Sequence, residues 1–113
     1  MTRGEIYTAA ARGAYTGKPR PVVIVQDDRF DATTSVTICP FTTNQIDAPL
    51  VRIQIASTPN NGLDRPSSLM VDKITTVPRS GLGEQLGRLS DDELVQLNRS
   101  LMVFLGLASV SQP

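Results

Sequence analysis

The chain has 113 residues, of which 40% are apolar, and its eleven basic and eleven acidic side chains cancel. This length and composition predict one globular domain over residues 1–113 and argue against a disordered chain. The sequence lacks the roughly 18 consecutive apolar residues of a membrane helix. It also lacks a signal-peptide core and a second cysteine, so we expect a cytoplasmic protein.

Short β-type segments separated by turn residues make up the first half of the chain. Strands are expected at residues 5–10, 21–25 and 36–41, separated by a Gly/Pro-rich loop and a polar connection. The middle segment, "PVVIV", is continuously apolar, which is typical of a strand buried on both faces. Pro40 within the third segment predicts an edge strand or a bulge there.

The second half continues the pattern up to residue 89. Residues 51–55 alternate apolar and polar side chains, as a half-buried strand does. Residues 57–68 read as a long polar loop, and further strands are expected at 69–77 and 84–89. The "PRSGLG" segment between them, residues 78–83, could form one short turn of helix.

A helix is predicted at the C-terminal end. Ser90 and Glu93 form a capping-box pattern, and Gly106 marks the end of the helix. A core-facing stripe at helical spacing is formed by Leu94, Leu97, Leu101, Phe104 and Leu105. Apolar side chains off this stripe, which a second subunit could cover, are Val95, Met102 and Val103.

Strands that follow one another without intervening helices argue against a parallel sheet. The predicted fold class is mainly β: a small, strongly bent antiparallel barrel capped by a C-terminal helix.

Histidine is absent and Cys39 is the only cysteine, so the usual ligands of a zinc site and the usual neutral-pH base are missing. No Gly-rich phosphate loop occurs either, and we expect no metal or other cofactor. Without a histidine to activate it, Cys39 is interpreted as a packing residue. Residues 1–20 carry a local excess of three positive charges, which could attract phosphate.

The ordered series "RGEIY", "RPVVIVQDD" and "PFTTN", followed by "GRLSDDELVQLNRSLMVFLGL", resembles the MazF/PemK family of bacterial toxins across nearly the whole chain. The resemblance implies an SH3-like barrel, a homodimer and the toxin role in a type II toxin–antitoxin system. It further implies a sequence-specific, metal-independent endoribonuclease, an mRNA interferase that cuts single-stranded RNA and inhibits translation and growth. An antitoxin with an acidic C-terminal tail is the implied partner.

The family's catalytic roles map onto Arg20, which opens the second strand, and Thr42, which ends the third. Thr43 occupies the next position, where some members carry a second hydroxyl. Some relatives carry Arg-x-Asp in a later strand; here the Asp is present as Asp72, but Met70 stands at the Arg position. Taken singly, Arg20 fits a surface cation and Thr42 an ordinary strand-end residue, so only the joint pattern favours a site.

RNA can be cut by its own 2′-OH, and an enzyme must stabilise the charge that develops on the phosphoryl oxygens. Arg20 is assigned this electrostatic role because a guanidinium grips phosphate bidentately and keeps its proton at neutral pH. The general base is left open between Asp27, Asp28, Asp72 and solvent.

Candidate RNA-binding residues are Lys18, Tyr15, Thr43 and Asp72. Tyr15 and Phe30 could stack on unpaired bases or serve as core anchors. Base reading would then rest mostly on polar loop groups, including the region from Ser57 to Ser68.

Two other classes of function remain open at this point. A DNA-gyrase poison of the CcdB type shares the fold without nuclease chemistry and does not need Arg20 and Thr42 together. A peptide-binding SH3-like module normally needs an aromatic-lined groove, and this chain has no Trp, two Tyr and three Phe.

Overall fold

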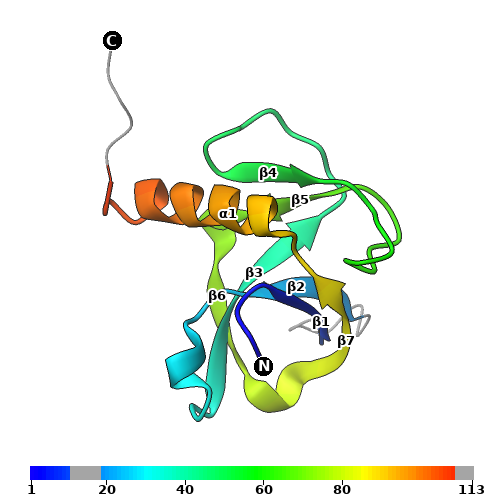
Figure 1. The fold of residues 1–113 in the computed structure, drawn as a ribbon, viewed down its shortest axis with the longest axis vertical. Coiled ribbons are helices and arrows are strands. Elements are labelled where there is room, and N and C mark those ends of the chain that lie inside the picture. The colour runs from blue at the N-terminus through cyan, green and yellow to red at the C-terminus, as the bar shows by residue number, and fades with distance from the viewer. Residues whose placement is uncertain (11–18, 109–113) are drawn as a thin grey trace.

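The computed structural model of the chain describes residues 1–10 and 19–108. They form one antiparallel sheet of seven strands and one long helix, which confirms the predicted mainly β class with a C-terminal helix (Figure 1). The element bounds are β1 (Glu5–Ala9), β2 (Arg20–Ile24), β3 (Ser35–Thr42), β4 (Arg52–Ile55), β5 (Ser67–Met70), β6 (Thr75–Pro78), β7 (Leu82–Arg88) and α1 (Asp91–Phe104).

The strand order is β4-β5-β3-β2-β1-β7, with β6 paired to the other part of the β3 edge. The sheet is open rather than a closed barrel, since no ladder among the described strands joins β7 to β4. The outer edge of β7 pairs with a loop instead of with β4. The N–H of Arg88 donates to the carbonyl of Asn60 at 3.0 Å, so the loop before β5 covers the edge that closure would use.

The long strand β3 organises the sheet. Its first half pairs with β6 through Ser35–Ile38, and its end pairs with β5 through Phe41 and Thr42. Pro40 lies between these two ladders, so its missing N–H removes no hydrogen bond on the side of β3 that faces β5 and β6. The expected edge strand or bulge at Pro40 is therefore wrong, because β3 is central and changes partner at this residue.

The core lies on both faces of β2 and β3. Val23 belongs to the cluster under α1, whereas Val22 and Ile24 belong to a second cluster with β6 and β7 side chains. All three are at most 4% exposed, which confirms the prediction of a strand buried on both faces. Cys39 is fully buried in the first cluster.

The single strand expected at residues 69–77 is wrong. The chain makes two strands there, β5 and β6, separated by a 3₁₀ helix at Val71–Lys73. The turn lets consecutive segments pair with different parts of β3, and it is held by fully buried Val71 and by an ion pair of Asp72. A short 3₁₀ helix at Arg79–Gly81 agrees with the expected turn of helix before β7.

The predicted cap of α1 is present in both directions. Ser90 Oγ accepts from the Glu93 N–H at 3.1 Å, and the Ser90 N–H donates to the Glu93 carboxylate at 2.9 Å. Gly106, with φ of +77°, follows the helix as expected. No helix in the described part of the chain is long and apolar enough to cross a membrane.

The predicted core stripe of α1 holds from Leu94 to Leu101 and fails at its end. Leu97 is fully buried, and Leu94 and Leu101 pack against the core, but Phe104 and Leu105 are 43% and 52% exposed. The reason is geometric: the last turn of α1 extends past the strands on the left of Figure 1 and has no sheet beneath it. Val95 and Met102 are each 45% exposed, as expected for side chains off the stripe.

Candidate functional site

The sequence places Arg20 between two prolines at the start of β2. Pro19 and Pro21 both favour extended backbone, and Pro21 holds the residue before it in the β region. Arg20 pairs with Ala9 at the end of β1 and is exposed. No ion pair of Arg20 occurs within residues 1–10 and 19–108, so no carboxylate of these residues competes with an anion for its guanidinium.

Thr42 ends β3 on the neighbouring strand. The β2–β3 ladder pairs Val22 with Pro40, and continuing that register by two residues places Thr42 opposite Arg20. The N–H of Val25 donates to Thr37, so the alternation makes Arg20 and Thr42 a non-hydrogen-bonded pair. Side chains of such pairs lie close, with Cβ atoms roughly 4.5–5.5 Å apart. Arg20 and Thr42 therefore lie at the same end of the β2–β3 pair, with their side chains on the same face of the sheet.

The Thr42 hydroxyl has one interaction of its own. The backbone N–H of Asn44 donates to Thr42 Oγ1 at 3.1 Å. This contact occupies an acceptor position and fixes the side chain, and it leaves the hydroxyl proton free to donate. Thr42 is therefore suited to donate to a phosphoryl oxygen beside Arg20.

A hollow of about 430 Å³ opens at this end of β2, and we call it the mouth hollow. It is lined by Thr8, Pro19, Pro21, Thr43, Gly62, Leu63, Asp64, Arg65 and Leu86. Both chain neighbours of Arg20 belong to this set, and so does Thr43. Asp64 and Arg65 are exposed charged groups that the sequence analysis did not single out, although the Asn-Gly pair just before them is a strong turn signal.

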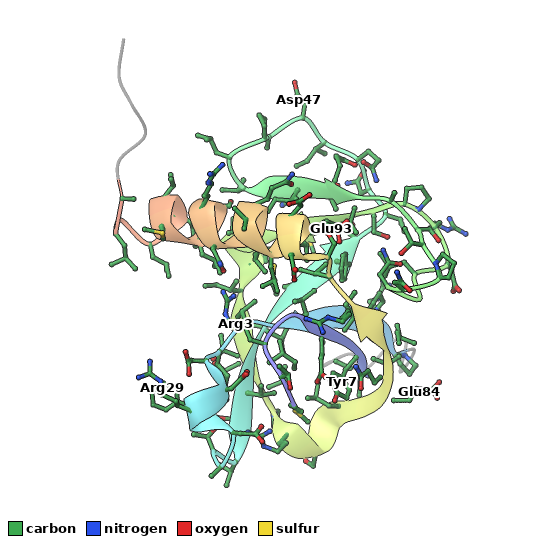
Figure 2. All side chains as sticks on the ribbon, in the orientation of Figure 1. Arg3, Tyr7, Arg29, Asp47, Glu84 and Glu93 are labelled. Atoms are coloured by element: carbon green, nitrogen blue, oxygen red, sulfur yellow. The ribbon has the colours of Figure 1, made fainter. Side chains whose placement is uncertain are left out.

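The candidate bases Asp27 and Asp28 lie at the opposite end of β2 from Arg20. The Arg29 backbone N–H and Nε both donate to Asp27, at 2.9 and 3.0 Å, and these bonds hold the pKa of Asp27 below its usual value. Asp28 accepts from the Arg3 N–H at 2.7 Å. Asp27 serves the turn around Arg29, which projects into solvent in Figure 2, and Asp28 fastens that turn to the N-terminal segment. Both follow the end of β2 that pairs near Thr37, whereas Thr42 lies at the other end of β3.

Asp72 is also distant from Arg20 and Thr42. Thr42 pairs with Ser68 near the start of β5, whereas Asp72 follows the end of that strand. Arg52 holds Asp72 in a bidentate ion pair, with Nε–Oδ1 of 3.0 Å and Nη2–Oδ2 of 3.2 Å. Arg52 is the cross-strand partner of Met70, the position where some relatives carry arginine. A guanidinium from β4 therefore pairs with Asp72, and Arg52 lies on the polar face of the alternating segment "VRIQI".

This ion pair gives a stability prediction. Hydrogen bonds from Arg52 lower the pKa of Asp72 below its ordinary value of 3.8, so its contribution is present above that pH and fades as the pH falls below it. We expect Asp72→Ala to lower the free energy of unfolding by about 1–2 kcal/mol at pH 7, because Arg52 is left largely buried and unpaired.

Urea unfolding followed by circular dichroism at pH 7, 5 and 3 measures this effect. The difference from the wild type should be equal at pH 7 and 5 and smaller at pH 3. Asp47→Ala, at an exposed loop residue (Figure 2), is the matched control and should change little. A difference that grows on acidification would contradict the assignment.

The predicted RNA-binding residues Lys18 and Tyr15 lie outside the described residues. Phe30 is 55% exposed, hence no core anchor, and lies at the far end of β2. Arg3 Nε donates to the carbonyl of Val25, at the end of β2 away from Arg20. Arg3 and Arg20 therefore do not belong to one positive cluster.

Burial raises the pKa of the Cys39 thiol to about 12, which supports its interpretation as a packing residue. Within the described ranges, no three His, Cys, Asp or Glu side chains gather as a metal site would require.

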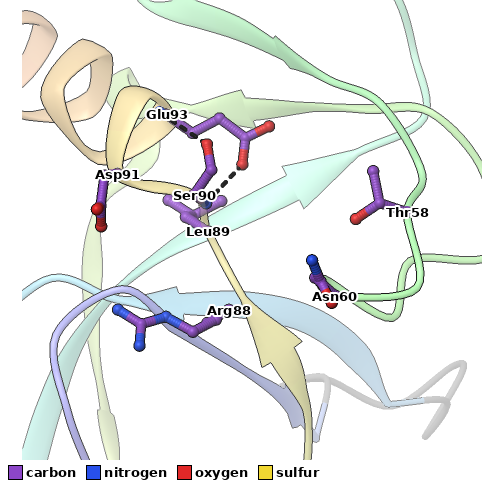
Figure 3. A pocket seen from close by; sticks show the side chains of 7 residues that line it. All are labelled: Thr58, Asn60, Arg88, Leu89, Ser90, Asp91 and Glu93. Atoms are coloured by element: carbon purple, nitrogen blue, oxygen red, sulfur yellow. Dashed lines mark hydrogen bonds between the residues drawn. The ribbon is translucent and has the colours of Figure 1, made fainter.

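Two further hollows, each of about 560 Å³, lie elsewhere. One is at the start of α1, where Ser90 and Glu93 are engaged in the cap and Asp91 opposes Arg88 (Figure 3). Its acidic side chains make it poorly suited to phosphate. The other lies between β4, the loop before it and α1, and includes Leu50, Arg99 and Val103.

Comparisons with known proteins identify the family and the fold. Residues 2–105 match the model of the PemK-like, MazF-like toxins of type II toxin–antitoxin systems. A probable endoribonuclease MazF of Mycolicibacterium smegmatis is 66% identical over 108 residues, covering 96% of this chain and 99% of the relative.

Solved structures show the same fold. Toxin MazF-mt6 of Mycobacterium tuberculosis superposes with a TM-score of 0.78 at 26% identity, over 93% of this chain and 99% of that one. A mycobacterial endoribonuclease in complex with its cognate antitoxin has a TM-score of 0.76 at 24% identity, over 97% and 99%. The family model and the close relative each span nearly the whole chain. The chain therefore belongs to the PemK-like, MazF-like toxin family of type II toxin–antitoxin systems.

Proposed function

We propose that residues 1–113 act as one toxin domain, an endoribonuclease that cuts single-stranded RNA, mRNA included, at a short sequence and so inhibits translation and growth. Its relatives named endoribonuclease MazF support the activity. The site is supported by the β2–β3 register, whose continuation by two residues sets Arg20 opposite Thr42. The comparisons give no support to a CcdB-type gyrase poison.

In this mechanism the substrate supplies its own nucleophile. The ribose 2′-oxygen attacks the adjacent phosphorus as its proton is removed, and the bond from phosphorus to the 5′-oxygen breaks. The leaving 5′-oxygen takes up a proton from solvent, so the products are a 2′,3′-cyclic phosphate and a 5′-hydroxyl. Arg20 binds two phosphoryl oxygens and Thr42 donates to one of them, so both stabilise the charge of the transition state. Asp27, Asp28 and Asp72 are all engaged elsewhere, which favours solvent as the proton acceptor.

The reaction is proposed to need no metal ion, because the chain has no histidine and phosphate charge can be met by guanidinium groups. The test is to incubate the purified protein with single-stranded RNA, the same RNA base-paired, and matched DNA, all in EDTA. We expect cleavage of the single-stranded RNA alone. Activity that disappears with chelator and returns with magnesium would overturn metal independence, and RNA left intact with and without magnesium would overturn the nuclease.

A homodimer is the proposed assembly. Exposed apolar side chains on α1 and just after it support it, and they are Val95, Met102, Phe104, Leu105 and Leu107. We expect light scattering at micromolar concentration to report twice the chain mass, and Met102→Glu to shift the mass toward one chain. A monomeric wild type at that concentration would contradict the dimer.

The proposed partner is an antitoxin with an acidic, partly disordered tail, acting in the cytoplasm where the RNA is. The mycobacterial relative of the same fold is in complex with its cognate antitoxin. Arg20 at the start of β2 and Arg65 in the loop before β5 are exposed positive charges against which such a tail could dock and exclude RNA. Co-expression of the adjacent small open reading frame should relieve toxicity, and unchanged toxicity would argue against this partner.

A further inference from the structure

Thr42 belongs to a row of side chains that crosses the sheet from β3 to β4. Thr42 pairs with Ser68 on β5, and Ser68 pairs with Gln54 on β4. Residues directly opposite one another in a ladder point to the same face of the sheet, so these three side chains share one face. Two strand spacings, roughly 10 Å, separate Thr42 from Gln54. A nucleotide that extends across β5 from a phosphate at Thr42 therefore reaches Gln54.

The row is polar only on the β4 side of the candidate site. In the other direction, Arg20 pairs with Ala9, and Ala9 pairs with Leu82 on β7. Ala9 belongs to the second core cluster and Leu82 packs against it, so neither side chain can hydrogen-bond a base. Toward β4 the row ends instead in the exposed amide of Gln54. A substrate strand therefore finds hydrogen-bonding side chains along β5 and β4.

We propose that Gln54 reads the base of the nucleotide next to the scissile phosphate and that Gln45 binds the backbone of that nucleotide. The inference rests on the proposed nuclease function and deepens it by naming a base-recognising residue. Gln26 and Gln85 donate to nearby groups, whereas the Gln54 side chain makes no hydrogen bond within residues 1–10 and 19–108. Its amide offers a donor and an acceptor side by side, the pattern that pairs with N7 and N6 of adenine.

The Gln45 side chain is held beside Thr42 by Ser68. Ser68 is fully buried in β5, and its hydroxyl donates to Gln45 Oε1 at 3.4 Å. Because Ser68 is the cross-strand partner of Thr42, this contact places the Gln45 amide next to the Thr42 side chain. With Oε1 facing Ser68, the two N–H donors of Nε2 remain for an oxygen of the RNA backbone. Gln45 is thus suited to hold the nucleotide that lies between Thr42 and Gln54.

The next row on the same face offers the base an apolar surface and holds β4 in place. Arg52 pairs with Met70. Each lies two residues along its strand from the first row, so their side chains share its face. Met70 is partly exposed and can contact the ring of a base. Arg52 is held in the bidentate ion pair with Asp72, which fastens β4 to the 3₁₀ turn. Gln54 therefore lies on a strand whose position is fixed, as recognition of one base requires.

The test uses the full chain and an RNA library randomised on both sides of a cut site, with cut ends sequenced and kcat and KM measured on the preferred substrate. At one nucleotide flanking the cut, the wild type should favour adenine. Gln54→Leu should reduce that preference roughly five- to a hundredfold, because a bidentate pair is lost. Gln54→Glu should move the preference from adenine toward cytosine, since a carboxylate accepts from cytosine N4 but repels adenine N7. Gln45→Ala should raise KM about two- to tenfold and leave kcat and base preference nearly unchanged.

Gln85→Leu is the matched control, because Gln85 is exposed on β7, at the other end of the strand order from β4, and this variant should behave as the wild type. All four variants should keep the melting temperature, because they alter exposed side chains. A wild type that does not favour adenine at either flanking nucleotide, or a Gln54 variant with unchanged preference, would overturn the inference while leaving the nuclease intact. Failure of the wild type to cut any RNA would instead overturn the proposed function.

Discussion

Arg20→Ala should reduce RNA cleavage by about two orders of magnitude or more. Removing one preorganised donor from a site that stabilises transition-state charge typically costs roughly 2.7–4 kcal/mol in the barrier. Arg20 is exposed at the strand end and has no ion partner among residues 1–10 and 19–108, so the fold should survive its loss. The measurement is kcat/KM on a single-stranded RNA, together with the melting temperature.

Two companion variants separate charge from geometry. Arg20→Lys should restore part of the activity, because an ammonium keeps the charge but lacks the bidentate fork. Thr42→Ala should weaken cleavage less than Arg20→Ala, since it removes one neutral donor. Arg29→Ala, a cation at the far end of β2, is the control and should be nearly neutral. Near wild-type cleavage by Arg20→Ala would make Arg20 a solvated surface charge and the site assignment wrong.

Gly87→Ala should cause a large loss of stability. The added Cβ would meet backbone atoms of Asn60 and Asn61, with the Asn61 carbonyl carbon and Cα each 2.7 Å away. Backbone atoms cannot rotate aside as a flexible side chain can. The expected loss in unfolding free energy therefore reaches or exceeds the roughly 3 kcal/mol upper end of ordinary overpacking.

Gly81→Ala is the matched control, because a Cβ there has no heavy atom within 4 Å. Its unfolding free energy should stay equal or rise by up to about 1 kcal/mol, since alanine restricts the unfolded chain. Chemical unfolding of both variants and the wild type measures the difference. A Gly87→Ala protein as stable as Gly81→Ala would show that the loop does not press on β7 as described.

Much of the fold was predictable because local signals and tertiary environment agree. The run "PVVIV" is apolar at every position because β2 is buried on both faces. The cap at Ser90 and the stop at Gly106 depend on residues within a few positions of each other, so the bounds of α1 could be predicted from sequence.

The predictions that were wrong share a physical cause: each of these features depends on a partner far away in the chain. Residues 69–77 look like one strand because nothing local reveals that β3 offers two separate edges. The open edge of β7 reflects its contact with Asn60, and Phe104 and Leu105 are exposed because the sheet ends before the last turn of α1.

The candidate site was predictable in part. Arg20 and Thr42 were identified from separate motifs, and their proximity follows from the β2–β3 register. The loop from Ser57 to Ser68 was identified by its polar residues, but its contact with β7 through Asn60, Asn61 and Gly62 could not be predicted, because it depends on a distant strand. The pairing of Asp72 with Arg52 likewise needs the β4–β5 register, which no local pattern supplies.

The central claim is that this site cuts RNA through the 2′-OH of the substrate, and a single 2′-deoxy substitution tests it most directly. An RNA with one mapped cut site is compared, in EDTA, with the same RNA carrying 2′-deoxyribose only at the nucleotide 5′ to the cut. The account predicts cleavage of the first, with a 2′,3′-cyclic phosphate end, and no cleavage of the second at that bond. Equal cleavage of both, or a 3′-hydroxyl end on the upstream product, would contradict it.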